Sequence, residues 1–260
     1  MSLALTSAHD TPVPQKERAV LVTGATGDIG IALCEAFRQQ NYRVIATDHR
    51  GDSNAADVFF NFDLADLPRS PTAQQRFKQA VLDGLEDSSL CCCVNNAAVQ
   101  ILASLDDLDD ADVQQTLDVN LFAPLIICRL FLPHLERARG SVVNIGSIHA
   151  DLTKPGFLAY ATSKGALRTL TQALAVDLGP RVRVNCIQPA AVDTQMLRAG
   201  FAENTSGLTR LHQYHPSQRI ADASEIGEIA AFLASEAARS ITGASIDVSN
   251  GIAARLHDPA

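Results

Sequence analysis

The feature that most constrains the fold is a short apolar segment followed by a glycine-rich turn and a helical pattern. Residues 19–23 are Ala-Val-Leu-Val-Thr, and glycine then recurs at Gly24, Gly27 and Gly30. Glycines at this spacing let the backbone turn tightly, approach a phosphate closely and pack a helix against the preceding strand. The amino end of that helix would face the phosphates of a bound nucleotide. The sequence therefore predicts a strand, turn and helix that bind a dinucleotide.

A second apolar segment, residues 43–47, ends at Asp48, eighteen residues after Gly30. An acidic side chain about 20 residues beyond such a turn is placed to hydrogen-bond the adenosine ribose. A phosphate on this ribose would meet the same negative charge, so Asp48 predicts NAD in preference to NADP. Arg50 is the one nearby residue that would soften this preference.

A tyrosine and a lysine four residues apart are the strongest candidates for chemistry. Tyr160 and Lys164 would stack on one face of a helix. A cation within about 4–6 Å favours the phenolate and lowers the pKa of tyrosine, which is about 10 when unperturbed. Ser147 follows a buried strand predicted over residues 140–146, so its hydroxyl would emerge at the carboxyl end of that strand. Asn120 lies in a long helical pattern where asparagine has poor propensity and no cap to form, which suggests a polar task inside the fold.

In the order and spacing of these motifs, the chain resembles the short-chain dehydrogenase/reductase family from Ala19 to Gly251. The resemblance extends to Asn-Asn-Ala-Ala at residues 95–98, to Gln-Pro-Ala-Ala-Val-Asp-Thr at residues 188–194 and to a closing strand within residues 241–251. It implies an α/β fold with a doubly wound parallel sheet of Rossmann type in a single domain. It also implies hydride transfer between a nicotinamide cofactor and a secondary alcohol or ketone.

The resemblance assigns roles to a catalytic tetrad. Tyr160 would exchange a proton with the substrate oxygen, while Lys164 lowers its pKa and hydrogen-bonds the nicotinamide ribose. Ser147 would hold the substrate oxygen, and Asn120 would keep a water in the proton relay that leads from Lys164 to solvent. The implied cofactor-binding residues are Gly24, Gly27, Asp28, Ile29, Gly30, Asp48, Asp63, Leu64, Asn95, Ala97, Tyr160, Lys164, Pro189, Val192 and Thr194.

Three positions depart from the family pattern. Asp28 occupies the place of the middle glycine in the usual TGxxxGxG motif. A carboxylate there suits the helix dipole but would repel a pyrophosphate, so we expect Asp28 to point away from the phosphates. Ala98 and Ala190 replace glycines that usually follow Asn-Asn-Ala and Pro189. These two changes are small and affect fine cofactor geometry rather than binding.

Substrate identity should depend on the segment from Gln195 to Ile220, which in this family forms a mobile lid over the nicotinamide. Arginines and histidines give the segment a positive, hydrogen-bonding character. We expect a polar substrate, such as a hydroxy acid or sugar derivative, contacted by Arg198 and by His149, which lies two residues after Ser147. The alternatives are a solvated loop for the segment and a solvent-facing position for His149.

Composition fits a compact, well-buried chain and argues against several classes of function. The 260 residues are 47% hydrophobic and carry a net charge of −8 with no basic stripe, which makes nucleic acid a poor partner. No apolar run approaches the ~20 residues that span a bilayer, so we predict no membrane association and a cytoplasmic location. The six cysteines lack metal-ligand spacing, and we predict buried reduced thiols and no metal.

We predict a mobile tail over residues 1–18 and one dinucleotide-binding oxidoreductase domain over residues 19–260, with the substrate lid at about 195–220. By resemblance the protein forms a homotetramer, and its other partner is a small-molecule alcohol or ketone. One alternative is an NAD(H)-binding regulator with the same fold and little turnover, and another is an epimerase or dehydratase. The complete tetrad favours an enzyme, and the short chain leaves little room for an epimerase's separate substrate domain.

Overall fold

The computed structural model describes residues 18–202 and 205–256, in which strands and helices alternate along most of the chain. The strands are β1 (Arg18–Thr23), β2 (Arg43–Asp48), β3 (Val58–Asn61), β4 (Ser89–Asn95), β5 (Ser141–Ile145), β6 (Arg183–Pro189), β7 (Val192–Asp193), β8 (Ala221–Asp222) and β9 (Ser245–Val248). The helices are α1 (Asp28–Gln39), α2 (Pro71–Leu85), α3 (Asp110–Leu117), α4 (Ala123–Ala138), α5 (Leu158–Leu178), α6 (Gln195–Gly200), α7 (Thr205–Tyr214) and α8 (Ala223–Ala234). Short helical turns are η2 (Leu64–Asp66), η3 (Asp118–Phe122), η4 (Ile148–Ala150), η5 (Glu236–Ala238) and η6 (Ile252–Ala254).

Seven parallel strands form one sheet in the order β3-β2-β1-β4-β5-β6-β9. The chain winds outward from β1 to β3 and then returns to the centre to wind the other way from β4. Open sheets of this kind bind ligands at the carboxyl ends of the strands, where the winding direction reverses. The prediction of a single-domain, doubly wound α/β fold is confirmed, and the crevice lies between β1 and β4.

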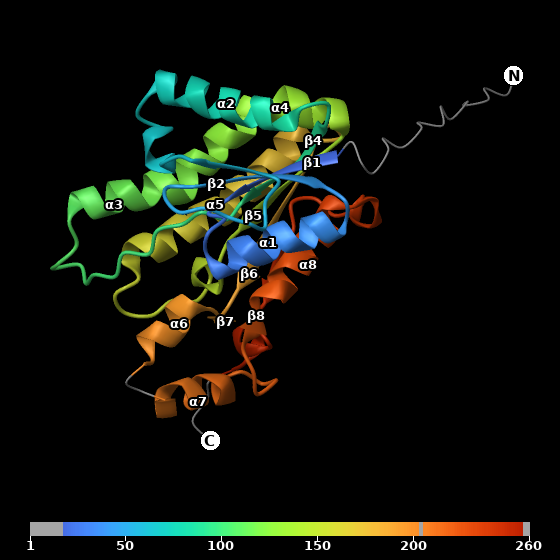
Figure 1. Cartoon of the computed structure of the whole chain (residues 1–260). Coiled ribbons are helices and arrows are strands. Elements are labelled where there is room, and N and C mark those ends of the chain that lie inside the picture. The colour runs from blue at the N-terminus through green and yellow to red at the C-terminus, as the bar shows by residue number, and fades with distance from the viewer. Residues whose placement is uncertain (1–17, 203–204, 257–260) are drawn as a thin grey trace, which may run out of the picture.

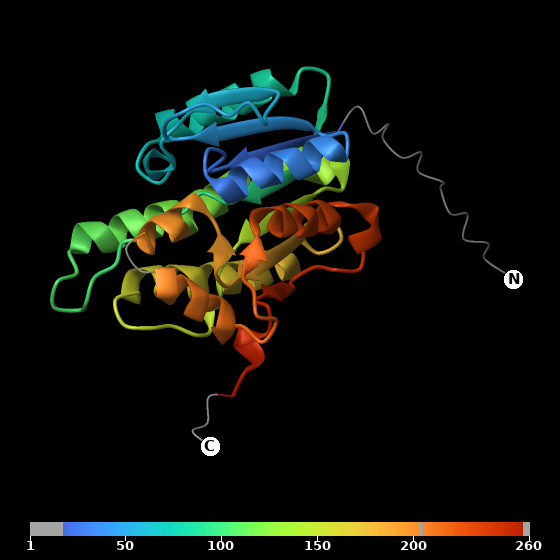
Figure 2. The same cartoon turned by 60° about the horizontal axis from the view of Figure 1, so that its bottom comes forward.

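Helices cover both faces of this sheet because its strands are apolar on both sides. Val20 and Val22 of β1 pack with Phe37 of α1 on the face that α1 shares with α8. Leu21 points to the opposite face and joins Phe77 of α2 in a core that α4 and α5 complete. The two helical layers are separate in Figure 1, and Figure 2 shows the same arrangement turned by 60°.

The run from α3 through η3 to α4, residues Asp110–Ala138, is a helical stretch of 29 residues, which is long enough to cross a bilayer. An 18-residue window within it has a mean hydropathy of 1.5, so the stretch passes as a membrane span by length and composition alone, although polar residues interrupt its apolar runs. Here it packs against β4, and Ile127, Phe131 and Leu135 are fully buried in the core. Its apolar character therefore reflects burial inside the protein.

Two further expectations concern the ends of the chain and the cysteines. Residues 1–17 of the predicted tail lie outside the described residues, whereas Arg18, the last residue of that tail, begins β1 and corrects the boundary.

All six cysteines are free thiols, and five of them are buried, as predicted. Burial raises the pKa of Cys92 to about 12, which keeps that thiol protonated and unreactive.

Candidate active site at the carboxyl edge of the sheet

The glycine turn between β1 and α1 needs glycine at two positions for different reasons. Gly24 has a φ of +66°, and a Cβ there would lie 2.7 Å from the Ala97 Cα. A Cβ on Gly30 would lie 2.0 Å from the Gly24 carbonyl oxygen, so glycine lets α1 pack against the turn. Gly27 is the N-cap of α1 and provides no side-chain cap. The first-turn amide groups of α1 are therefore suited to binding an anion.

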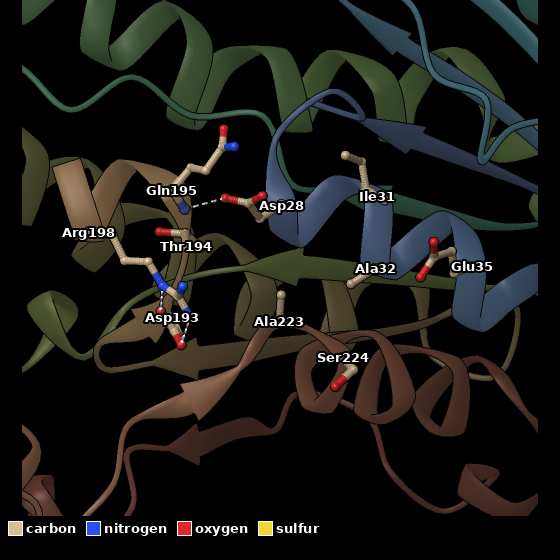
Figure 3. A pocket seen from close by; sticks show the side chains of 10 residues that line it. All are labelled: Asp28, Ile31, Ala32, Glu35, Asp193, Thr194, Gln195, Arg198, Ala223 and Ser224. Atoms are coloured by element: carbon tan, nitrogen blue, oxygen red, sulfur yellow. Dashed lines mark hydrogen bonds and ion pairs between the residues drawn. The ribbon is translucent and has the colours of Figure 1, made fainter.

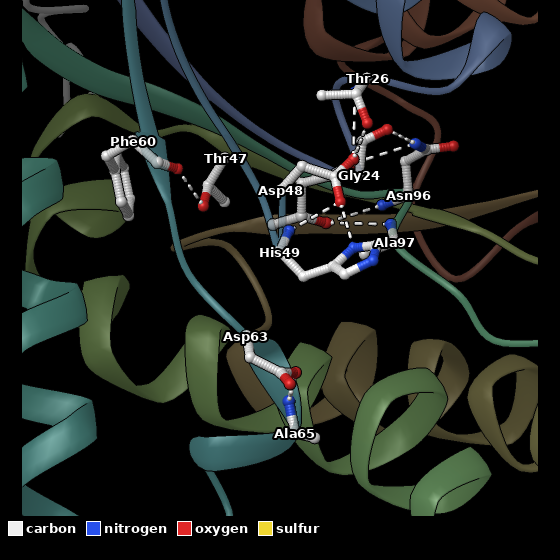
Figure 4. A network of polar contacts seen from close by, with 11 residues as sticks. Gly24, Thr26, Thr47, Asp48, His49, Phe60, Asp63, Ala65, Asn96 and Ala97 are labelled. Atoms are coloured by element: carbon white, nitrogen blue, oxygen red, sulfur yellow. Dashed lines mark hydrogen bonds and ion pairs between the residues drawn. The ribbon is translucent and has the colours of Figure 1, made fainter. Parts of the chain in front are cut away.

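Asp48 ends β2 beside this turn and accepts hydrogen bonds from two sides (Figure 4). One carboxylate oxygen accepts from the Thr26 amide at 3.1 Å and from the Thr26 hydroxyl at 2.7 Å. The other accepts from the His49 amide at 2.7 Å and lies 2.7 Å from His49 Nδ1. Burial acts to raise the pKa of Asp48, but these hydrogen bonds outweigh it and hold the pKa below its ordinary value. The carboxylate is ionised at neutral pH.

Asn96 holds the segment after β4 against the glycine turn, and Asn95 does not. The Asn96 side chain donates to the carbonyl oxygens of Thr23 and Gly24, at 3.0 and 2.9 Å, and Figure 4 shows these bonds. Asn95 is buried and donates to the Asn144 side chain within the sheet at 2.8 Å. The predicted cofactor residue Asn95 thus has its side chain in the interior, because alternate strand residues point to opposite sides.

The remaining predicted cofactor residues lie at several places around the crevice. Asp63 caps η2 by accepting from the Ala65 amide at 2.9 Å, and Leu64 is buried behind it. Ile29 lies in the first turn of α1, Pro189 ends β6, and the buried Val192 begins β7. Thr194 caps α6 by accepting from the Leu197 amide at 3.2 Å, so its hydroxyl is engaged within the chain.

Ser147, Tyr160 and Lys164 meet at the end of β5. The Ser147 hydroxyl accepts from the His149 amide at 3.2 Å and also interacts with the Tyr160 phenol. Lys164 lies one turn beyond Tyr160 on α5, with Nζ 5.6 Å from the centre of the phenol ring. The ammonium is buried and donates to the Ile145 carbonyl at 2.8 Å. The helical spacing of the tyrosine and lysine therefore places both groups beside the serine.

Burial dominates the electrostatics of this cluster. It lowers the pKa of Lys164 from 10.5 to about 8, because the charged form loses its hydration. It also raises the pKa of Tyr160, and the hydrogen bond with Ser147 acts in the opposite direction. The expectation that Lys164 lowers the pKa of the tyrosine is not met in this structure, because desolvation of the phenolate is the largest influence.

Asn120 lies in η3, a π-helical turn between α3 and α4. Its side-chain oxygen accepts from the Val99 amide at 2.8 Å, and its nitrogen donates to the Val99 carbonyl at 2.9 Å and to Ser163 Oγ at 3.0 Å. The asparagine thus joins the segment after β4 to α5. Asn120 is a poor helix former, but it lies in a π-helical turn rather than in a regular α-helix. Such turns frequently occur at functional sites.

The structure adds a network behind Ser147 that the sequence did not reveal. The Gln188 side chain donates to the Ser147 carbonyl at 3.2 Å and to an Asp151 carboxylate oxygen at 2.9 Å. The other Asp151 oxygen pairs with Arg168, one turn beyond Lys164 on α5. The only available signal was the position of Gln188 near the carboxyl end of a predicted strand. This network links β6, the serine loop and the helix that carries Tyr160.

His149 is brought to the site, whereas the charge of Arg198 is engaged elsewhere. The His149 ring stacks on Phe157 with centroids 4.3 Å apart, and it lies 5.8 Å from the Tyr160 ring. Arg198 pairs with both oxygens of Asp193 at 2.6 Å. This corrects the expected positive character at Arg198, because a bidentate carboxylate satisfies its guanidinium. No cluster of three or more metal-ligating side chains occurs in residues 18–202 and 205–256.

A glycine turn at a sheet crevice and a buried serine, tyrosine and lysine define an oxidoreductase of Rossmann type. A family model described as enoyl-(acyl carrier protein) reductase matches residues 24–253. The chain belongs to the short-chain dehydrogenase/reductase family.

Known relatives extend this assignment. A probable galactose dehydrogenase of Rhizobium meliloti is 31% identical over 91% of this chain and 95% of its own. The ligand-free aldohexose dehydrogenase of Thermoplasma acidophilum is 28% identical, with a TM-score of 0.86 over 95% of this chain and 98% of that chain. A 3-oxoacyl (acyl-carrier-protein) reductase of Agrobacterium tumefaciens with NADP bound is also 28% identical, with a TM-score of 0.81 over 91% and 94%. Family members of this fold thus include sugar dehydrogenases and an NADP-bound reductase.

Proposed function

We propose that this protein is an NAD-linked dehydrogenase that interconverts a polar secondary alcohol and its ketone, with Tyr160 as the acid or base. One observation carries the proposal: the Ser147 hydroxyl, the Tyr160 phenol and the buried Lys164 ammonium meet at the carboxyl end of β5. They lie at the same edge of the sheet as the glycine turn. A regulator that only binds NAD(H) has no use for these three groups together.

Each side chain has a defined task in the proposed reaction. Ser147 orients the substrate oxygen by a hydrogen bond and stabilises the charge that develops on it. Tyr160 accepts the hydroxyl proton when the alcohol is oxidised and returns it when the ketone is reduced. Lys164, one turn beyond Tyr160, is placed to hydrogen-bond the nicotinamide ribose, and Asn120 holds the backbone near residue 99 against α5. A bound nicotinamide supplies the two-electron chemistry.

The residues of the crevice fit a dinucleotide. The uncapped amino end of α1 offers amide donors to a pyrophosphate, and the ionised Asp48 offers acceptors to ribose hydroxyls. The same carboxylate would repel a 2′-phosphate, which supports NAD over NADP. Because a related reductase holds NADP, this preference needs a direct test.

A polyhydroxylated substrate, an aldose in particular, is supported by sugar dehydrogenases among the relatives, including the two named above. His149 adds a polar group beside Tyr160, and stacking on Phe157 holds its ring in place. Burial and the nearby Lys154 charge lower the pKa of His149, so the neutral ring can both donate and accept hydrogen bonds. This chemistry suits hydroxyl groups, whereas a carboxylate would favour a cationic side chain.

The test is reduction of NAD and NADP by a panel of aldoses, hydroxy acids and apolar secondary alcohols. We expect NAD-dependent turnover with aldoses, and Tyr160→Phe should lower it by about 10²- to 10⁴-fold. Tyr42→Phe is the matched control, because Tyr42 precedes β2 at the opposite edge of the sheet. Tight NADH binding without turnover of any substrate would instead favour the regulator.

Cofactor choice is tested separately with Asp48→Ala. We expect this change to reduce the ratio of kcat/KM for NAD over that for NADP by at least tenfold, because it removes one acceptor and one repulsive charge. An unchanged ratio, or a wild-type preference for NADP, would contradict the assignment. The homotetramer and the cytoplasmic location stay predictions, and light scattering of the purified protein tests the first.

A further inference from the structure

Asp28 is the least expected residue of the cofactor-binding turn, and its carboxylate is directed toward a distant part of the chain. It is the first residue of α1, where the family pattern has glycine. Its Oδ2 accepts a hydrogen bond from the backbone amide of Gln195 at 2.7 Å, across 167 residues of sequence. Figure 3 shows this bond between α1 and α6. The carboxylate is thus engaged by α6, in line with the expectation that it avoids the phosphates.

Gln195 is the first residue of α6 and of the lid segment, residues 195–220, so the bond lies where that segment leaves the sheet. The amides of the first turn of α6 receive one acceptor from the residue that precedes the segment, Thr194 Oγ1, and one from α1, the Asp28 carboxylate. The Arg198 to Asp193 ion pair joins α6 to β7 but does not reach α1. Among these three interactions, only the Asp28 bond ties the lid segment to the cofactor-binding helix.

An open pocket of about 400 Å³ lies next to this bond, between α1, α6 and α8. Its lining includes Asp28, Ile31 and Glu35 of α1, Arg198 of α6 and Ser224 of α8 (Figure 3). Where side chains leave such a space, a single hydrogen bond contributes a large share of the local attachment. A charged acceptor makes that bond stronger than a neutral one.

We propose that Asp28 is a positioning residue that fastens the start of the lid segment to the cofactor-binding helix. A glycine at this position has no side-chain acceptor, so the bond to α6 depends on the aspartate. The bond also directs the negative charge toward an amide donor, which allows an acidic residue beside an anion-binding turn. The inference rests on the proposed function only in assigning residues 195–220 to the substrate side of the site.

The test compares Asp28→Ala with Glu35→Ala. Both variants remove a carboxylate from α1 that lines the same pocket, but only Asp28 bonds to α6. Hydrogen exchange of residues 195–200 should accelerate roughly tenfold in Asp28→Ala and stay at the wild-type rate in Glu35→Ala. The KM for the alcohol should rise by a similar factor in Asp28→Ala, with a smaller change in kcat, and should stay at the wild-type value in Glu35→Ala.

Unchanged exchange of residues 195–200 in Asp28→Ala would overturn the proposal, as would equal effects of the two variants. If Asp28→Ala folds poorly, Asp28→Asn retains the shape and a weaker acceptor, and it should give an intermediate exchange rate. Hydrogen exchange is measured without substrate, so it tests the anchor even if no alcohol is turned over. If the wild type turns over no alcohol but exchange of residues 195–200 still differs between Asp28→Ala and Glu35→Ala, the proposed function is refuted and the role of Asp28 as an anchor is supported.

Discussion

Replacing Lys164 by methionine tests the electrostatics of the site through the stability of the fold. The lysine is 2% exposed, and burial lowers its pKa from 10.5 to about 8. At about 1.36 kcal/mol per pKa unit, keeping this side chain charged in the folded state costs about 3 kcal/mol at pH 7. Methionine has a similar length and removes that cost. It also removes the hydrogen bond to the Ile145 carbonyl, which is worth about 1 kcal/mol.

The sign of the effect follows from proton binding. The pKa of Lys164 is lower in the folded state than in the unfolded state, so the unfolded chain binds more protons between about pH 8 and pH 10.5. Wild-type stability therefore rises through this window relative to the methionine variant. Lys164→Met should be about 2 kcal/mol more stable than wild type at pH 7 and about equal to it at pH 10, while losing activity at both.

The assay is urea unfolding of wild type, Lys164→Met and Lys78→Met at several values between pH 7 and pH 10, at one protein concentration. Lys78 is partly exposed on α2, so its variant controls for the loss of a positive charge. A stability difference for Lys164→Met that stays constant across this range would refute the reasoning. It would mean that the folded protein does not penalise the buried ammonium.

Three further predictions concern the turn, the serine and the pH dependence. Gly30→Ala should destabilise the fold by about 3 kcal/mol, because the added Cβ would lie 2.0 Å from the Gly24 carbonyl oxygen. Thermal unfolding tests this, with Gly200→Ala as the control, because a Cβ on Gly200 would meet no atom within 4 Å. Gln188→Leu should lower kcat about tenfold without changing NADH affinity, because it removes the hydrogen bond that holds the Ser147 carbonyl. The control Gln74→Leu removes a hydrogen bond to the Leu67 carbonyl and should leave kcat unaltered. Because burial raises the pKa of Tyr160, kcat/KM for alcohol oxidation should rise with pH across the neutral range, and a flat profile would contradict its role as the base.

Local patterns in the sequence were sufficient for the architecture and for the positions of the main chemical groups. The apolar segments before Gly24 and Ser147 are β1 and β5, and Asp48 is the last residue of β2. Tyr160 and Lys164 lie on one helix, as their spacing of four residues requires. Such patterns are readable because strand and helix periods relate residues that are close in the chain.

The tertiary structure alone decided which partners these groups have. Asp28 bonds to Gln195, Arg198 is engaged by Asp193, and Asn96 rather than Asn95 holds the glycine turn. Burial rather than the neighbouring ammonium sets the direction of the Tyr160 pKa shift. Hydrogen-bond partners and desolvation depend on which distant segments pack together, and no local period records that. Local sequence patterns place the chemical groups at the carboxyl edge of the sheet, and packing between distant segments decides which of those groups remain available to a ligand there.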